Sequence, residues 1–164
     1  MEFANDLLEL AKLLANLYPE HPRQANLRRA LSTAYYAIFH LLIFEATLNW
    51  GRVEQRAQLG RILNHGRMKT ASVEMVAALN SNAKRYNSDS PERMAAEHLL
   101  YFCNAFVQAQ QYRNDADYNT AKEWTTTEVV DQIEEVTKAF HLWSTVRQGA
   151  TAQAYLVSLF GERR

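Results

Sequence analysis

Four residues that can hydrogen-bond or carry charge recur along one apolar stretch of the chain: Arg29, Ser32, Tyr36 and His40. Their spacings of three, four and four residues place them on one stripe of a helix. The surrounding stretch, 28–44, contains no Gly or Pro and is apolar almost all the way round, as in a helix buried in a bundle or at a subunit interface. Because unpaired polar groups are costly in such a place, the stripe must face partners.

A second group of chemically capable residues follows at 113–119. It combines a guanidinium, two carboxylates and a phenol, from Arg113, Asp115, Asp117 and Tyr118. Because Asn and Asp prefer turns and caps to helix interiors, this composition predicts a turn between two long helices. Two interpretations are open. Either Asp115 or Asp117 caps the next segment and pairs with Arg113 while Tyr118 packs, or the turn is a binding site that meets the stripe.

The elements that must position these groups are helices. Apolar periodicity and capping signals predict an all-α chain with long helices packed antiparallel, and there is no strand pattern or internal repeat. In the first helix, Leu7, Leu10, Leu14 and Leu17 are predicted to lie on one face. A polar, turn-rich run at 80–89 predicts a mobile loop. The predicted helices span 3–18, 23–49, 53–64, 71–80, 90–112 and 125–147, with a last short helix around 155–160.

Composition limits the class of protein. With 164 residues, 48% hydrophobic and 22% charged, the chain is predicted to be one soluble domain, 1–164. The net charge is zero, but bases gather at 21–69 and acids at 89–135. These regions either neutralise each other within the fold or across a dimer, or the basic region forms a groove for phosphates. A lone cysteine, an acidic N-terminus and no apolar run of about 18 residues predict a cytoplasmic location and no membrane contact.

Most standard catalytic patterns are missing from the sequence. There is no glycine-rich phosphate loop and no His-Glu-x-x-His pair, so neither a cofactor nor a metal is predicted. Cys103 lies inside an apolar helix and is predicted to pack. His65 stands beside Gly66, where it either ends a helix or supplies an imidazole to the site.

Two motifs combine the residues described above. The first reads Ser-x-Ala-Tyr-Tyr-Ala-x-Phe-His and the second Arg-x-x-Ala-Asp-Tyr. Their residues are Ser32, Ala34, Tyr35, Tyr36, Ala37, Phe39 and His40, then Arg113, Ala116, Asp117 and Tyr118. In type, order and separation they resemble the motifs of the small prokaryotic branch of the HEPN superfamily. The resemblance covers roughly residues 27–140.

This resemblance implies an up-and-down bundle of four or five long helices plus short extra helices, which forms a homodimer. Many members are toxin ribonucleases encoded beside a nucleotidyltransferase-like antitoxin, and others are non-catalytic binding or scaffold domains. The ribonucleases carry an Arg followed, four to six residues later, by a His. That pair suits metal-independent RNA cleavage, in which the imidazole moves a ribose 2′-hydroxyl proton and the guanidinium holds the phosphate. Here Tyr118 stands where the His is expected, and a phenol is a weaker base than an imidazole at neutral pH.

Three hypotheses follow. The chain is an RNA- or nucleotide-binding domain, or an endoribonuclease in which Arg113 fixes phosphate and Tyr118 or His40 transfers the proton, or a helical scaffold module held by its own polar contacts. In each case we expect part of the stripe to lie within hydrogen-bonding reach of the 113–118 segment. The candidate substrate-binding residues are Asp117, Asp115, Tyr36, Ser32, Arg29 and His65.

Overall fold

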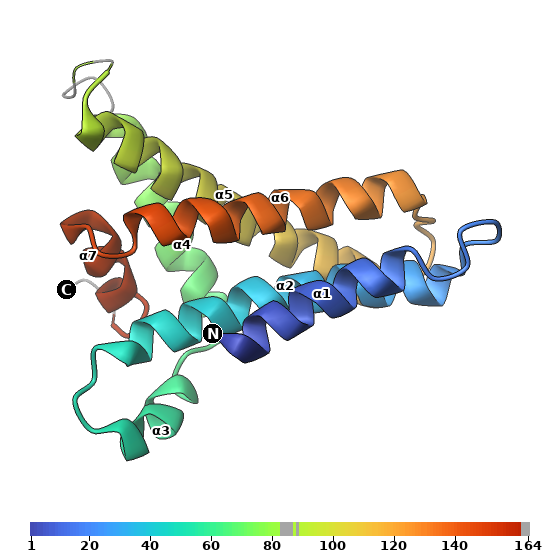
Figure 1. Ribbon diagram of the computed structural model, residues 1–164, viewed down its shortest axis with the longest axis horizontal. Coiled ribbons are helices and arrows are strands. Elements are labelled where there is room, and N and C mark those ends of the chain that lie inside the picture. Colours follow the sequence, from blue (N-terminus) through green and yellow to red (C-terminus); the bar gives the residue numbers. More distant parts are fainter. Residues whose placement is uncertain (83–86, 88, 162–164) are drawn as a thin grey trace. The chain divides into compact units, whose positions relative to one another are not determined.

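Every regular element that the structure describes is a helix, so the predicted all-α class is confirmed (Figure 1). The computed structural model describes residues 1–82, 87 and 89–161. The elements are α1 (Glu2–Ala15), α2 (Gln24–Leu48), the 3₁₀ helix η1 (Val53–Gln55), α3 (Arg56–Gly60), α4 (His65–Asn82), α5 (Pro91–Tyr118), α6 (Thr126–Val146) and α7 (Ala150–Ser158).

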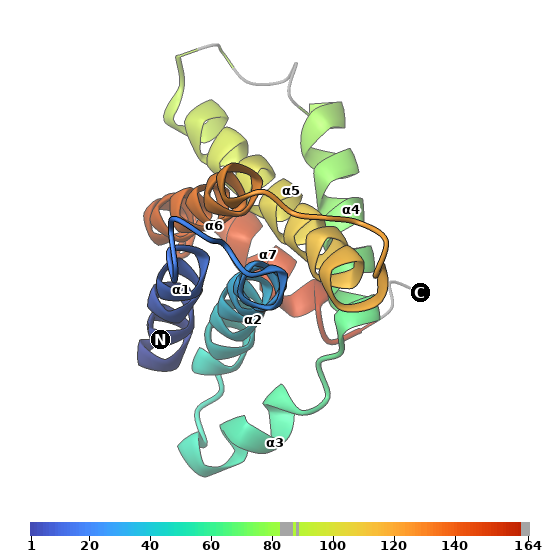
Figure 2. The ribbon, with the colours of Figure 1, turned by 90° about the vertical axis from the view of Figure 1, so that its right-hand side faces the viewer.

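The chain divides into two compact units. The first combines Met1–Leu41 with Gln108–Lys138, and the second combines Leu42–Val107 with Ala139–Arg164. The helices α2, α5 and α6 therefore each contribute a segment to both units. Within the first unit, α1 lies antiparallel beside the first part of α2, and the first part of α6 also runs alongside α1 (Figures 1 and 2).

Helix α1 turns to the core a face adjacent to the one that carries the predicted leucine series. Its buried residues are Ala4, Leu8, Ala11 and Ala15, whereas Leu10 and Leu17 are exposed. Small alanines let α1 approach its neighbours closely, and this contact determines which way the helix faces. The helix also ends at 15 rather than 18, where the side chain of the following Asn bonds a carbonyl in the last turn.

Helix α2 is the core helix of the first unit. Leu27, Leu31, Ala34, Tyr35 and Ile38 are each no more than 1% exposed. By length and mean hydropathy α2 is the one helix, among the described residues, that could cross a membrane, but 67% of its apolar window is buried inside the protein. Core helices of soluble proteins meet the same criterion. The burial therefore accounts for its apolar character.

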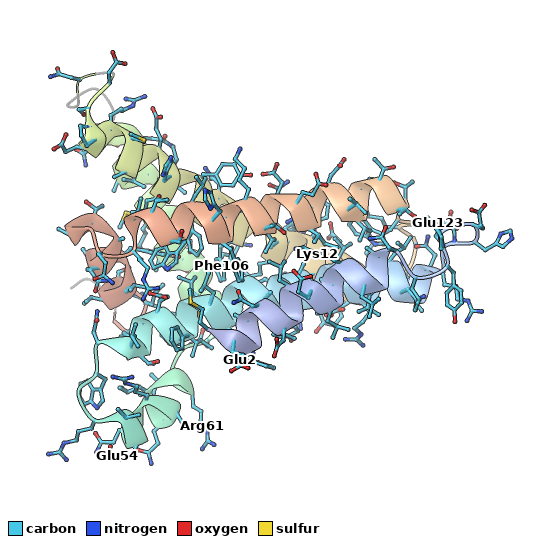
Figure 3. The ribbon with its side chains drawn as sticks, in the orientation of Figure 1. Glu2, Lys12, Glu54, Arg61, Phe106 and Glu123 are labelled. Carbon is cyan, nitrogen blue, oxygen red and sulfur yellow. The ribbon has the colours of Figure 1, made fainter. Side chains whose placement is uncertain are left out.

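The segment after α2 differs from its prediction. In place of one basic helix over 53–64, the structure has η1 and the short α3, where the side chains of Glu54 and Arg61 are exposed (Figure 3). His65 does not end a helix but begins α4, because the Asn64 side chain accepts a hydrogen bond of 2.9 Å from the backbone N–H of Arg67. Helix α4 runs to Asn82, and the rest of the predicted mobile loop lies mostly outside the described residues.

The second unit has an aromatic core. The ring of Trp143 lies 4.7 Å from that of Phe102 and 6.4 Å from that of Tyr155, between ring centres. The hydroxyl groups of Tyr155 and Ser72 are 2.7 Å apart and share a hydrogen bond. Cys103 is fully buried as a packing residue, and this burial raises the pKa of its thiol.

A buried carboxyl group should make stability in this unit depend on pH. Glu45 is 3% exposed, and its Oε1 lies 3.3 Å from Nη1 of Arg147. Burial raises the pKa of Glu45, although Arg147 and the nearby Trp143 partly oppose the rise. The unfolded chain therefore ionises at lower pH than the folded one, and the contribution of Glu45 to stability is lost as pH rises through its folded pKa.

We expect Glu45→Gln to reduce this loss, because glutamine mimics the protonated carboxyl. Relative to the native chain, the variant should gain free energy of unfolding in urea titrations as pH rises above the ordinary pKa of a glutamate, about 4.3. The matched control is Glu74→Gln, which alters an exposed glutamate of the same unit. Equal pH dependence of the native chain and Glu45→Gln would contradict the expectation.

Candidate binding site

Residues 113–118 form the last turns of α5, so the predicted turn at this point was wrong. The Nε2 group of Gln111 donates to Asp115 at 3.0 Å, and Nε of Arg113 lies 2.9 Å from Oδ2 of Asp117. Both pairs have the four-residue spacing at which helical side chains meet, and they offset the low helix propensity of Asn and Asp here. As a result, Arg113 and Asp117 lie on one face of a helix.

Arg28 holds the end of α5 in place. Its Nη1 donates to the carbonyls of Ala116 at 2.8 Å and of Asn119 at 3.1 Å, and its Nη2 donates to those of Thr120 and Lys122. The carbonyl of Ala116 belongs to the last turn of α5, where carbonyls ordinarily lack a partner within the helix. The negative end of the helix dipole at this point also favours a cation.

The connection into α6 is held from the same helix. Gln24 on α2 donates to the carbonyl of Trp124 at 2.7 Å and accepts from its backbone N–H at 3.0 Å. The predicted capping box then starts α6, since Thr125 and Glu128 bond each other's backbone N–H groups at 2.9 and 3.2 Å. The hydrogen bond from the backbone of Thr125 lowers the pKa of Glu128.

Arg28→Ala is expected to lower the free energy of unfolding by about 1.5–3 kcal/mol, because it removes the charged donor of one carbonyl in the last turn of α5 and of three carbonyls in the segment that follows. Arg29→Ala is the matched control: the neighbouring arginine is exposed, and its loss should change stability by less than about 0.5 kcal/mol. Chemical unfolding of the two variants measures the difference. Similar losses in both would show that Arg28 does not stabilise the end of α5.

A polar network joins α2 to α5. The hydroxyl of Ser32 donates to Oδ1 of Asp117, and Nη2 of Arg113 donates to the hydroxyl of Tyr36 at 3.2 Å. Nη1 of Arg113 donates to the side chain of Asn114 at 3.1 Å. The Nε–H of Arg113 does not point at Asp117, so their contact is an ion pair without a directed hydrogen bond. The expected contact between the stripe and the 113–118 segment is thus present.

The network keeps Arg113 charged and fixes its position. Burial lowers the pKa of Arg113, but the hydrogen bond with Tyr36 and the proximity of Tyr36, Asp117 and Tyr118 outweigh burial and raise it. Behind it, Tyr35 is fully buried; burial raises the pKa of its phenol, and the charge of Arg113 opposes this rise. The site therefore presents a permanent cation with a fixed orientation.

The outer side of the site is aromatic. The guanidinium carbon of Arg113 lies 5.5 Å from the ring centre of Tyr118 and 5.8 Å from that of Tyr36. Tyr118 is 72% exposed, whereas the Arg113 side chain is 19% exposed. An exposed aromatic ring beside a fixed cation can stack on a planar ligand while the cation meets a nearby negative charge.

The structure also places the remaining predicted site residues. Arg29, the first residue of the predicted stripe, is exposed, and Asp115 bonds Gln111. The ring of His40 lies 4.9 Å from that of Phe3 and 6.4 Å from that of Tyr36, between ring centres. His65 belongs to the second unit.

Sequence reasoning missed Arg28 and Gln24, although the sequence carries a signal for both. Gln24, Arg28, Ser32 and Tyr36 are spaced by four residues throughout, and each contacts the end of α5 or the connection that follows. A stripe drawn from Arg29 with a first spacing of three overlooks this regular series. The contacting face shares Ser32 and Tyr36 with the predicted stripe but begins with Gln24 and Arg28 in place of Arg29.

The polar and aromatic groups of this site suit an anionic ligand that is partly aromatic. Its groups are a guanidinium, a carboxylate, a serine hydroxyl and two phenols. Among the residues that the structure describes, no group of three His, Cys, Asp or Glu side chains could hold a metal ion. No protein-family model, no curated protein and no solved structure matches the chain.

Proposed function

We propose that the chain is a HEPN-type, non-catalytic domain that binds single-stranded RNA or a nucleotide at the Arg113–Tyr118 end of α5. The single observation that carries the proposal is the exposed ring of Tyr118 beside the fixed guanidinium of Arg113. A base stacks on the phenol, and the adjoining phosphate meets the guanidinium. Sequence-tolerant binding of single strands uses this combination of aromatic platform and cation.

The contacts of Arg113 favour binding over cleavage. Its partners are Asp117, Tyr36 and Asn114, with Tyr118 alongside, and none of these described residues supplies an imidazole. The imidazole of His40 lies beside the rings of Phe3 and Tyr36, 4.9 and 6.4 Å away between ring centres. Metal-independent cleavage requires a base near the ribose 2′-hydroxyl at neutral pH, so we place the ribonuclease hypothesis second.

A specific observation favours a further candidate, the scaffold module. The polar stripe and the end of α5 bond to each other within the first unit, which by itself explains why Arg113, Ser32 and Tyr36 are polar. This candidate leaves the exposure of Tyr118 without a role. A binding measurement therefore separates it from the proposed function.

The test uses a labelled single-stranded RNA, with retention followed by anisotropy and integrity followed on a denaturing gel. We expect retention of intact RNA, with an affinity that falls as salt rises because a phosphate contact releases counterions. Cleavage that is lost in Arg113→Ala would establish the ribonuclease instead. Absence of both retention and cleavage in the folded protein would support the scaffold module.

The resemblance supplies the remaining parts of the proposal. We propose a cytoplasmic homodimer that requires no cofactor and has a nucleotidyltransferase-like antitoxin as a possible genomic partner. Rescue of overexpression toxicity by the product of a neighbouring gene would support the toxin–antitoxin assignment. These parts are independent of the RNA measurement.

A further inference from the structure

Helix α1 leaves a continuous apolar face uncovered. Leu10, Leu13 and Leu17 are 43%, 62% and 38% exposed, and Phe3 is 58% exposed although one edge of its ring meets His40. Because α1 uses mainly alanines to contact its own unit, its large side chains point away from the core. Exposed apolar residues are ordinary when scattered, but these follow one helix face and so form a patch.

The spacing of this face is that of a helix–helix seam. Phe3, Leu7, Leu10, Leu14 and Leu17 alternate steps of four and three residues, the pattern by which one helix packs along another. The pattern is also nearly symmetric about Leu10, because Phe3 and Leu17 each lie seven residues from it. A twofold axis at Leu10 would therefore place Phe3 of one copy opposite Leu17 of the other.

We infer that this face of α1 packs antiparallel against α1 of a second copy of the chain, about a twofold axis near Leu10. We call residues Phe3, Leu7, Leu10, Leu14 and Leu17 the α1 seam. An interface between identical surfaces is the usual arrangement in homodimers. The inference rests on the homodimer in the proposed function and adds the surface that forms it.

Charge selects the antiparallel direction and the protein partner. The first half of α1 carries Glu2, Asp6 and Glu9, whereas its second half carries Lys12, which bonds Glu9 of the same helix at 2.8 Å (Figure 3). Beyond the C-terminal end, the Arg23 guanidinium lies 4.4 Å from the ring centre of Tyr18. Antiparallel packing keeps the acidic halves of the two copies apart and pairs opposed helix dipoles, whereas parallel packing places the acids side by side. The same acids disfavour an anionic membrane as the occupant.

The first test measures the mass of the protein in solution over a range of concentrations. Leu10→Glu places two carboxylates at the twofold axis, so we expect the dimer dissociation constant to rise at least about tenfold, roughly 1.4 kcal/mol. Val157→Glu is the matched control: it changes a 73%-exposed apolar residue of α7 and should leave the constant unchanged. Far-UV circular dichroism spectra equal to that of the native chain in both variants show that the fold is retained.

The second test fixes the register by disulfide formation. The native Cys103 is buried, so an introduced cysteine is the reactive thiol. Leu10→Cys should cross-link to itself, and Phe3→Cys should cross-link to Leu17→Cys but not to itself, since a disulfide requires Cα atoms within about 7 Å. Efficient self-linking of Phe3→Cys would overturn the antiparallel arrangement.

The outcomes separate this inference from the proposed function. A dimer that Leu10→Glu does not weaken overturns the α1 seam but leaves the homodimer standing. A monomer at every concentration overturns both, while RNA retention, which uses residues of α5, is judged independently. Binding to phosphatidylserine vesicles that Leu10→Glu abolishes, without any change in mass, would assign the seam to a membrane and overturn the inference.

Discussion

Arg113→Ala is expected to lower the free energy of unfolding by about 2 kcal/mol and to abolish measurable RNA retention. The variant leaves Asp117 without its cation and the Tyr36 hydroxyl without its donor. Charge-assisted hydrogen bonds contribute about 1.5–3 kcal/mol. We take the lower part of that range because the two side chains of the ion pair are 19% and 26% exposed, so water screens them in part.

Urea titration of Arg113→Ala, Asp117→Ala and the double variant measures this effect. Because the two residues share one network, the double variant should lose less stability than the sum of the single variants. A loss of less than about 0.5 kcal/mol in Arg113→Ala would contradict the proposed role of the network. Arg113→Lys keeps the charge but loses the planar donor geometry, and should recover only part of the stability.

Tyr118→Ala is expected to weaken RNA binding by about 5- to 150-fold, which corresponds to about 1–3 kcal/mol for a base stacked on an aromatic ring. The ring is 72% exposed, so its removal should leave the melting temperature nearly unchanged. The matched control is Tyr118→Phe, which retains the ring and should retain most of the affinity. Equal affinities of the native chain and Tyr118→Ala would contradict the stacking role.

The two variants test different parts of the account. Arg113 is a structural residue of the first unit as well as the proposed phosphate ligand, so its variant alone could lose binding through loss of structure. Tyr118 lies outside the core, and its variant reports on binding alone. Agreement between them is expected if the site binds RNA.

Much of the fold could be predicted from the sequence because its signals are local. Helix α2 was predicted within one residue at each end, and the Ser90–Pro91 start of α5 and the Thr125–Glu128 capping box both occur as predicted. These features depend on neighbouring residues along the chain. The contact between the stripe and the 113–118 segment was also expected, because buried polar groups require partners.

The errors arose where tertiary contacts override local preference. Asn and Asp predicted a break at 113–119, but the Arg113–Asp117 pair and the donors of Arg28 keep α5 helical to Tyr118. Leucine spacing predicted one apolar face of α1, but the residues that the helix buries are mostly alanines on the adjacent face, Ala4, Leu8, Ala11 and Ala15. Periodicity shows that a helix has an apolar face but not which of two adjacent faces is buried.

The most direct test of the proposed function is photo-cross-linking of a single-stranded RNA that contains 4-thiouridine, followed by identification of the cross-linked peptide. The account predicts an adduct on the peptide that contains Tyr118, reduced in Tyr118→Ala and competed by unlabelled RNA. Adducts confined to the basic segment 52–69, or none in a folded protein, would contradict the assignment of the binding site to the end of α5.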